Sequence, residues 1–406
     1  MKINEWTLGL AAVGVVSMAS VARADEVKLV PLNTALASTT ISGYVDTSAT
    51  WNPGTGNANP APYAFNAGKQ DGFNLDLVDL KISKPLDEGK FSAGYTAEFI
   101  FGPDAAAING SSGASANIRE AHVDLRVPIG NGLDFQVGRF GNIIGYESTT
   151  SYLNPNYTHS YAWTMEPTEH TGVLATYKIN DMFTAQAGVA NTLSTGPING
   201  RNFSSAGGTT IESKKAIVSL LTVTAPDSWG FAKGSAFYVG FDHGPGPTPN
   251  FGAVHLADRN HLYLGATVNT PLKELTVGAS WDSIWDNDVG GVDTGYTSDL
   301  NGYASYKLTD KATFSVRGEY VKGSALAYMD AGANGTAVNF ADPWNKVLAL
   351  TATFDYALWA NVTSRLEARW DHAVDGSRPF GATNPTTFGG TKKNELMLAA
   401  NLIYKF

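Results

Sequence analysis

The chain has 406 residues, no cysteine and a formal net charge of −9. The absence of cysteine excludes a disulfide framework, a thiol nucleophile and a thiolate metal site. The negative charge disfavours nucleic acid as a partner, and no apolar run after the N-terminus is long enough for a membrane helix.

The first 24 residues indicate an export signal. Lys2 supplies a positive charge, residues 8–16 form a short apolar run, and Ala22-Arg23-Ala24 has the small-x-small pattern of a cleavage site. We therefore expect residues 1–24 to be removed near Ala24. Residues 25–406 would then form the mature protein, outside the cytoplasm.

Short segments with alternating apolar and polar residues follow to the end of the chain. Sixteen are predicted to be β-strands: 40–50, 73–84, 90–102, 117–128, 132–141, 171–179, 182–192, 214–225, 229–242, 260–269, 273–285, 298–307, 311–322, 345–356, 360–372 and 394–406. Tight turns and long polar loops alternate between them, which is typical of outer-membrane barrels.

This pattern predicts an all-β fold, a transmembrane antiparallel β-barrel of about sixteen strands. The first and last strands are expected to pair, because lipid offers no hydrogen-bond partner to an open sheet edge. Strands 214–225 and 229–242 have the weakest support, so fourteen and eighteen strands remain alternatives.

Charged residues share one face of several predicted strands and are expected to face a wet lumen. An Arg facing lipid at the midplane would cost about 2–4 kcal/mol. The predicted lumen wall comprises Glu98, Glu120, Asp124, Arg126, Arg317, Glu319, Arg365, Glu367 and Arg369. In the last strand, the residues predicted to face lipid are Leu398, Leu402, Tyr404 and Phe406. Arg139 falls on the apolar face of its predicted strand. It is therefore expected at the outer rim of the barrel, unless a bulge at Gly138 turns it inward.

No catalytic motif is present, and the seven histidines are scattered, so we expect neither an enzyme nor a cofactor. Asp282, Asp286, Asp288 and Asp293 form an acidic cluster that could bind Ca²⁺, but their spacing does not complete an EF-hand. A solvated acidic loop is the alternative.

Part of the chain resembles the OmpL-like putative β-barrel porin family. The motifs that carry the resemblance lie at 132–140, 145–147, 154–160 and 167–173, with weaker support from the opening strand at 41–48. The resemblance implies an outer-membrane porin and passive diffusion rather than energised transport.

In sixteen-stranded porins the loop after the fifth strand folds into the lumen and narrows it, so residues 142–170 are the predicted constriction. Its candidate residues are Glu147, His159, Glu166 and Glu169. They are expected to face Arg126, Arg317, Arg365 and Arg369 and to give a mild cation preference. The alternative is a solvated extracellular loop.

The chain departs from the family pattern at His159, where a basic residue is expected between the loop's Thr and Ser. Because His is largely neutral at pH 7, the departure implies a pore that is less favourable to anions and sensitive to pH.

We predict a passive diffusion channel for small hydrophilic solutes and ions. Its expected partners are outer-membrane lipid and lipopolysaccharide, the barrel-assembly machinery and, by analogy with other sixteen-stranded porins, further copies in a homotrimer. Two alternatives remain. One is a plugged barrel that binds a ligand or adheres through its outer loops, and the other is a soluble exported β protein.

Overall fold

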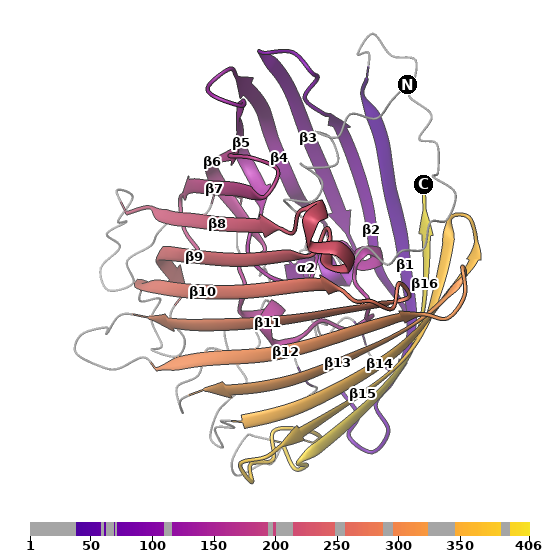
Figure 1. The fold of residues 1–406 in the computed structure, drawn as a ribbon. Helices are drawn as coiled ribbons and strands as arrows, with labels where there is room; N and C mark the ends of the chain where they lie inside the picture. Colours follow the sequence, from indigo (N-terminus) through magenta and orange to yellow (C-terminus); the bar gives the residue numbers. More distant parts are fainter. Residues whose placement is uncertain are drawn as a thin grey trace.

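In the computed structural model, the strands form one closed antiparallel barrel of sixteen (Figure 1). The structure describes residues 38–57, 61, 69, 71–108, 116–193, 198–199, 214–247, 256–286, 295–323, 346–382 and 390–406. The predicted signal at 1–24 and the part of the acidic cluster after Asp286 lie outside these residues. Within these ranges, no helix is long and apolar enough to cross a membrane.

The strands are β1 (Thr40–Trp51), β2 (Gly72–Lys84), β3 (Ser92–Phe101), β4 (Ala116–Val127), β5 (Leu133–Gly141), β6 (Glu169–Lys178), β7 (Phe183–Ala190), β8 (Ala216–Thr224), β9 (Ala236–Pro247), β10 (Leu256–Asn269), β11 (Leu275–Asp286), β12 (Tyr296–Lys307), β13 (Ala312–Gly323), β14 (Lys346–Trp359), β15 (Val362–Ala373) and β16 (Asn394–Lys405). The short helices are α2 (Pro103–Ile108), η1 (Ser151–Leu153), α3 (Tyr161–Met165) and η2 (Asp227–Ala232).

Every predicted strand is present, and the prediction of sixteen is confirmed. The largest error concerns β9, which was expected at 229–242 but begins at Ala236. Residues 227–232 instead form the 3₁₀ turn η2, in which Gly230 has a φ of 60° and Trp229 N–H donates to Pro226 O. The residues that the sequence pattern assigned to the start of this strand therefore belong to the turn.

The predicted closure between the first and last strands is also confirmed. β1 pairs with β16 from Tyr44 opposite Lys405 to Trp51 opposite Leu398. Beyond the Tyr44–Lys405 pair, Gly43 and Phe406 exchange two backbone hydrogen bonds of 3.1 and 3.0 Å. Every strand thus has two neighbours, which removes the edges that lipid cannot satisfy.

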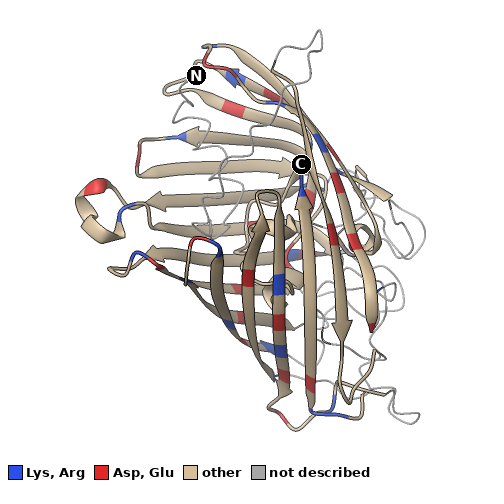
Figure 2. Ribbon diagram, turned by 90° about the vertical axis from the view of Figure 1, so that its right-hand side faces the viewer, with Lys and Arg blue, Asp and Glu red and all other residues tan. Residues whose placement is uncertain are grey.

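The wall has an apolar outer face and a polar inner face. In β16, Leu398, Leu402 and Tyr404 are exposed on the outside, whereas Glu395 and Asn401 are buried on the inside. Phe406 is also exposed. Figure 2 shows charged residues along the strands as well as at the turns. The buried charges of the strands, such as Arg317, Glu367 and Arg369, lie inward, as the alternation predicts.

Loops fill part of the interior. Ile143 and Ile144, which follow β5, pack against inward residues of β6 and β8 such as Leu174 and Leu220. Trp163 packs with Ile108 of α2 and with inward residues of β1, β2 and β3. The segment between β5 and β6 therefore lies inside the barrel and not over its mouth.

Candidate functional site

The segment at 142–168, called the inner loop below, crosses the lumen. Near its start, the Tyr146 ring stacks on Tyr303 of β12, with 4.1 Å between ring centroids. The wall makes room there through Gly278 of β11, where a side chain would collide with the Tyr146 hydroxyl. Further along, Tyr152 packs edge-on against Tyr44 of β1. The loop thus touches well-separated strands of the wall.

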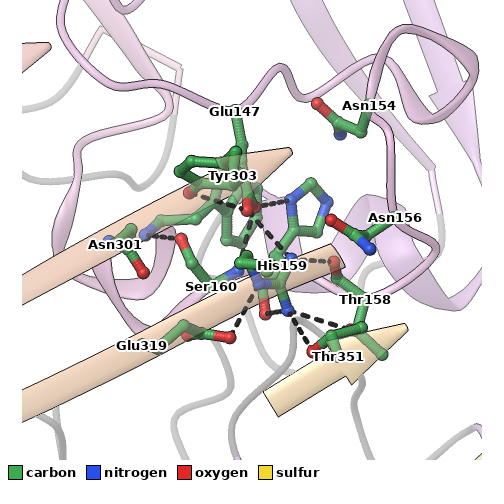
Figure 3. A network of polar contacts seen from close by, with 12 residues as sticks. Glu147, Asn154, Asn156, Thr158, His159, Ser160, Asn301, Tyr303, Glu319 and Thr351 are labelled. Carbon is green, nitrogen blue, oxygen red and sulfur yellow. Dashed lines mark hydrogen bonds and ion pairs between the residues drawn. The ribbon is translucent and has the colours of Figure 1, made fainter. Parts of the chain in front are cut away.

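Arg317 of β13 is the centre of the contacts between the inner loop and the wall. Its loop partners Glu147, Thr158 and His159 are labelled in Figure 3. The Arg317 guanidinium is fully buried and donates to Glu147 Oε1 at 2.9 Å and to Thr158 O at 2.6 Å. It also donates to Thr158 Oγ1 and to His159 O, both at 3.1 Å. One wall side chain therefore ties two separate parts of the loop together.

Carboxylates of the same wall accept hydrogen bonds from the backbone of the loop. Glu367 accepts from the N–H groups of Tyr157 and Thr158, at 2.6 and 3.0 Å. Glu319 accepts from Tyr161 N–H at 2.8 Å. Charge-assisted bonds of this kind are about twice as strong as neutral ones.

Two further arginines bind backbone carbonyls of the loop. Arg365 donates to Ser151 O at 3.0 Å and to Asn154 O at 2.8 Å, and Arg369 donates to His159 O. Residues predicted to line an open lumen on β13 and β15 therefore hold the inner loop in place.

Glu147 and His159 lie next to each other, and both belong to the network of contacts around Arg317. The Glu147 carboxylate is 3.0 Å from His159 Nδ1 and accepts from Ser160 N–H at 2.9 Å. Burial raises the pKa of Glu147, but Arg317, His159 and the Ser160 N–H outweigh burial and lower the pKa to about 2. The resulting stabilisation is present above the unfolded pKa of about 4.3 and is lost as the pH falls through 2.

Glu169, predicted to lie in the loop, is instead the first residue of β6 and pairs with Gly141. The prediction was wrong because the β5–β6 ladder extends further than the sequence suggested. The Glu169 carboxylate accepts from Arg139 Nη2 at 3.2 Å. Arg139 is buried and follows Gly138, whose φ of 136° turns the chain, so the inward alternative for Arg139 is the one observed.

A cavity of about 460 Å³ lies between the inner loop and the wall formed by β1–β7. Its charged lining includes Lys81, Glu98, Arg119, Glu120 and Asp124. The sequence pattern missed Arg119, because the β3–β4 register shifts between Glu98 and Phe99 and makes Arg119 an extra, inward residue. Its guanidinium contacts Glu98 and, on the inner loop, Thr149 and Thr150.

Arg126, expected opposite the loop, lies near the end of the barrel where the strands are joined by short turns. It forms an ion pair with Asp134 at 2.6 Å and donates to the backbone of Asp87. The basic side chains expected around the constriction therefore do not form one group.

A family model described as "Putative beta-barrel porin-2, OmpL-like" matches residues 38–406. The chain belongs to this porin family. The match confirms the resemblance that the loop motifs suggested, and it supports an outer-membrane porin channel rather than an enzyme. No curated protein is a detectable sequence relative of this porin.

Several solved porins share its fold. The outer membrane channel DcaP of Acinetobacter baumannii aligns with a TM-score of 0.59 at 12% identity, over 91% of this chain and 97% of that one. An anion-selective porin from Comamonas acidovorans gives 0.58 at 12% identity, over 91% and 99%. OprB of Pseudomonas putida gives 0.58 at 10% identity, over 91% and 94%. Identities this low establish the fold alone.

In the described part of this porin, no group of three or more His, Asp and Glu side chains could hold a metal ion. Of the acidic cluster considered as a calcium site, residues 287–294 lie outside the described residues.

Glu166, the remaining candidate of the inner loop, lies among other carboxylates. Burial is the main cause that raises its pKa well above the usual range, and Asp282, Glu147, Asp299 and Asp242 raise it further. The neutral acid is therefore favoured towards neutral pH, and ionisation costs stability as the pH rises. Glu166 lines the cavity, where burial favours its neutral form.

Replacing Glu166 by Gln is accordingly expected to leave the ion selectivity at pH 6 unchanged. The measurement is the reversal potential of single channels in a planar bilayer under a KCl gradient. At high pH the wild-type channel should become more selective for cations than Glu166→Gln, because only the wild type gains a charge. A variant that loses cation preference already at pH 6 would show that Glu166 is ionised there.

Proposed function

We propose that this porin is a passive diffusion channel for small hydrophilic solutes and ions, with a mild preference for cations. The observation that carries the proposal is the charge of the cavity beside the inner loop. Two basic residues, Lys81 and Arg119, and the histidine His122 face seven acidic residues: Asp79, Glu98, Glu120, Asp124, Asp134, Glu147 and Glu166. An acidic lining with low-dielectric walls concentrates cations.

The excess of acidic residues persists when neutral and paired carboxylates are discounted. Glu166 favours its neutral form, Glu147 is paired with Arg317, and Asp134 is paired with Arg126. Four wall carboxylates, Asp79, Glu98, Glu120 and Asp124, then remain against Lys81, Arg119 and His122. The anion-selective porin from Comamonas acidovorans shares the fold. Side chains in the lumen, and not the fold, set the sign of selectivity, so its preference does not transfer to this chain.

The assembly and delivery of the porin are part of the same proposal. A Vibrio cholerae OmpT with the same fold is described as a trimer form, which supports a homotrimer here. The predicted export signal at 1–24 supports cleavage near Ala24, and a closed antiparallel outer-membrane barrel suits the barrel-assembly machinery. Outer-membrane lipid and lipopolysaccharide would surround the apolar outer face.

One observation favours a second candidate, a plugged barrel that binds a ligand through its outer loops. The inner loop is largely buried and is tied to the wall by Arg317, Arg365, Arg369, Glu319 and Glu367. A loop held this firmly could seal the lumen. The cavity on the β1–β7 side favours the channel.

The two candidates differ in conductance. Purified protein in a planar bilayer under a salt gradient is expected to give stable steps with a reversal potential on the cation side. The double variant Glu120→Gln/Asp124→Asn should reduce the cation-to-anion permeability ratio by roughly twofold or more, since both residues line the cavity. Folded, inserted protein without conductance would support the plug, and steps that favour anions would refute the cation preference.

A further inference from the structure

The cavity beside the inner loop presents two unlike sides to a solute. Its volume of about 460 Å³ lies within the range of sites for small organic molecules, about 300–1,000 Å³. The wall side, formed by β1–β7, carries most of the charged residues, whereas the apolar residues Ile143, Ile144, Leu153 and Pro167 lie on the loop side. A solute with a charged end and an apolar body matches both sides.

Polar groups on the loop side are largely engaged within the protein. The hydroxyls of Thr149 and Thr150 hydrogen-bond to Arg119, and the Thr168 hydroxyl donates to Ile108 O. Of the two loop carboxylates in the lining, one is paired with an arginine, and burial favours the neutral form of the other. A solute therefore meets mainly apolar surface and satisfied polar groups on this side.

Asp124 of β4 is the wall carboxylate best placed to bind a cation. In the described part of the chain it has no Lys or Arg partner, and its side chain is 15% exposed. Its neighbours are His122 Nδ1 at 3.1 Å and Gln136 Nε2 at 3.3 Å. Asp79 also lacks a basic partner within the described ranges, but it is only 5% exposed and hydrogen-bonds to Glu98.

A second acceptor of the wall, on β7, lacks a donor. Gln186 lines the cavity and is 7% exposed, and its Nε2 donates to Thr176 Oγ1 at 3.1 Å. Its Oε1 has no hydrogen-bond partner among the described residues. Because an unsatisfied buried acceptor is costly, a solute that donates a hydrogen bond to this oxygen is favoured there.

Asp124 and Gln186 are too far apart for one ammonium group to contact both. They lie on β4 and β7, three strands apart in the barrel (Figure 1), with roughly 14 Å between the two backbones. Leu174 of β6, the strand next to β7, packs against Ile143 and Ile144 of the loop. A solute with an ammonium group at one end, an apolar body and a donor at the other end can span this distance.

We propose that the cavity binds small organic cations in which an apolar body separates an ammonium group from a hydrogen-bond donor. The ammonium group binds Asp124, the donor binds Gln186 Oε1, and the apolar body lies against Ile143 and Ile144 of the inner loop. The inference rests on the proposed cation channel and names the class of solute that the channel favours over inorganic cations.

The test compares three protonated amines at pH 7: tyramine, phenethylamine, which lacks the hydroxyl, and ethylamine, which also lacks the ring. Binding to the purified, detergent-solubilised full-length protein is measured by titration calorimetry, and block of the K⁺ current is measured in a planar bilayer. We expect tyramine to bind roughly fivefold more tightly than phenethylamine, and phenethylamine roughly tenfold more tightly than ethylamine.

Two variants test the two ends of the site. Asp124→Asn should weaken the binding of all three amines, by roughly tenfold for tyramine. Gln186→Met should abolish the difference between tyramine and phenethylamine, because only tyramine has a donor for Gln186. Asp258→Asn makes the same change as Asp124→Asn at a carboxylate outside the cavity lining, and it should bind all three amines like wild type.

Heat-modifiable migration of each variant establishes that it is folded. Calorimetry needs no conduction, so a channel without K⁺ steps refutes the proposed function, whereas the ranking of the amines still tests the site. Equal affinity of wild type for the three amines would overturn the proposal. So would a folded Gln186→Met that still prefers tyramine as strongly as wild type does.

Discussion

Replacing Arg317 by Met is expected to release the inner loop and to lower the free energy of unfolding by roughly 3–5 kcal/mol. Arg317 is buried and donates to Glu147, Thr158 and His159, so its loss leaves the Glu147 carboxylate without its guanidinium partner. Urea unfolding of the folded barrel in detergent measures the stability. Single-channel recordings should show added open-channel noise, because the middle of the loop is no longer held against β13.

Two further variants separate the loss of the charge pair from general damage. Arg317 pairs with two carboxylates, Glu147 at 2.9 Å and Glu319 at 2.7 Å. Arg317→Met/Glu147→Gln removes one of these two charges, so the double variant should be more stable than Arg317→Met alone. Lys214→Gln removes a partly exposed ion pair and should cost less than about 1 kcal/mol. A quiet Arg317→Met channel with wild-type stability would contradict an anchoring role for Arg317.

The fold could be predicted from the sequence because lumen-facing polar residues and outward-facing apolar residues alternate along each strand. In β15, Arg365, Glu367 and Arg369 alternate with Leu366, Ala368 and Trp370, and the structure buries the first set and turns the second outward. The error at β9 arose because Trp229 and Phe231 resemble strand residues. They are exposed aromatics of a turn, which local hydrophobicity cannot distinguish from a strand.

The inner loop was harder to predict than the wall, because its contacts join residues that are far apart in the chain. Arg317 and Glu147 are 170 positions apart, and no periodicity indicates that they meet. The strand alternation therefore predicted which types of residue lie in the lumen, but it did not show which charges neutralise each other. Arg365 and Arg369 were expected to line the pore, and they bind the backbone of the loop instead.

Arg119 was missed for a local reason. An irregularity in one ladder reverses the parity of every residue beyond it, and the β3–β4 register shifts beside Glu98. The available signal was a charged residue at a position that the strand alternation assigns to the apolar, outward face. Arg139 gave the same signal at Gly138 and was recognised, because glycine marks the irregularity there, whereas Ile118-Arg119-Glu120 contains no such residue.

Replacing Arg119 by Ala is expected to raise the single-channel conductance by roughly twofold or more and to strengthen the preference for cations. The Arg119 side chain reaches from β4 to Thr149 and Thr150 of the inner loop and so bridges the space between wall and loop. The large cavity and a second one of about 20 Å³ share Thr149 and Trp163 in their linings. Removing the bridge should widen the passage between them.

The variant Lys81→Gln separates the effect of the Arg119 bridge between wall and loop from the effect of removing a positive charge. Lys81 is the other basic residue of the cavity and pairs with Glu98 at 3.1 Å and Glu120 at 3.4 Å, on the wall and not on the loop. Its loss should shift the reversal potential towards cations as Arg119→Ala does, with a conductance near that of wild type. If Arg119→Ala conducts no better than Lys81→Gln, Arg119 acts only through its charge, and the narrowest part of the path lies elsewhere along the loop.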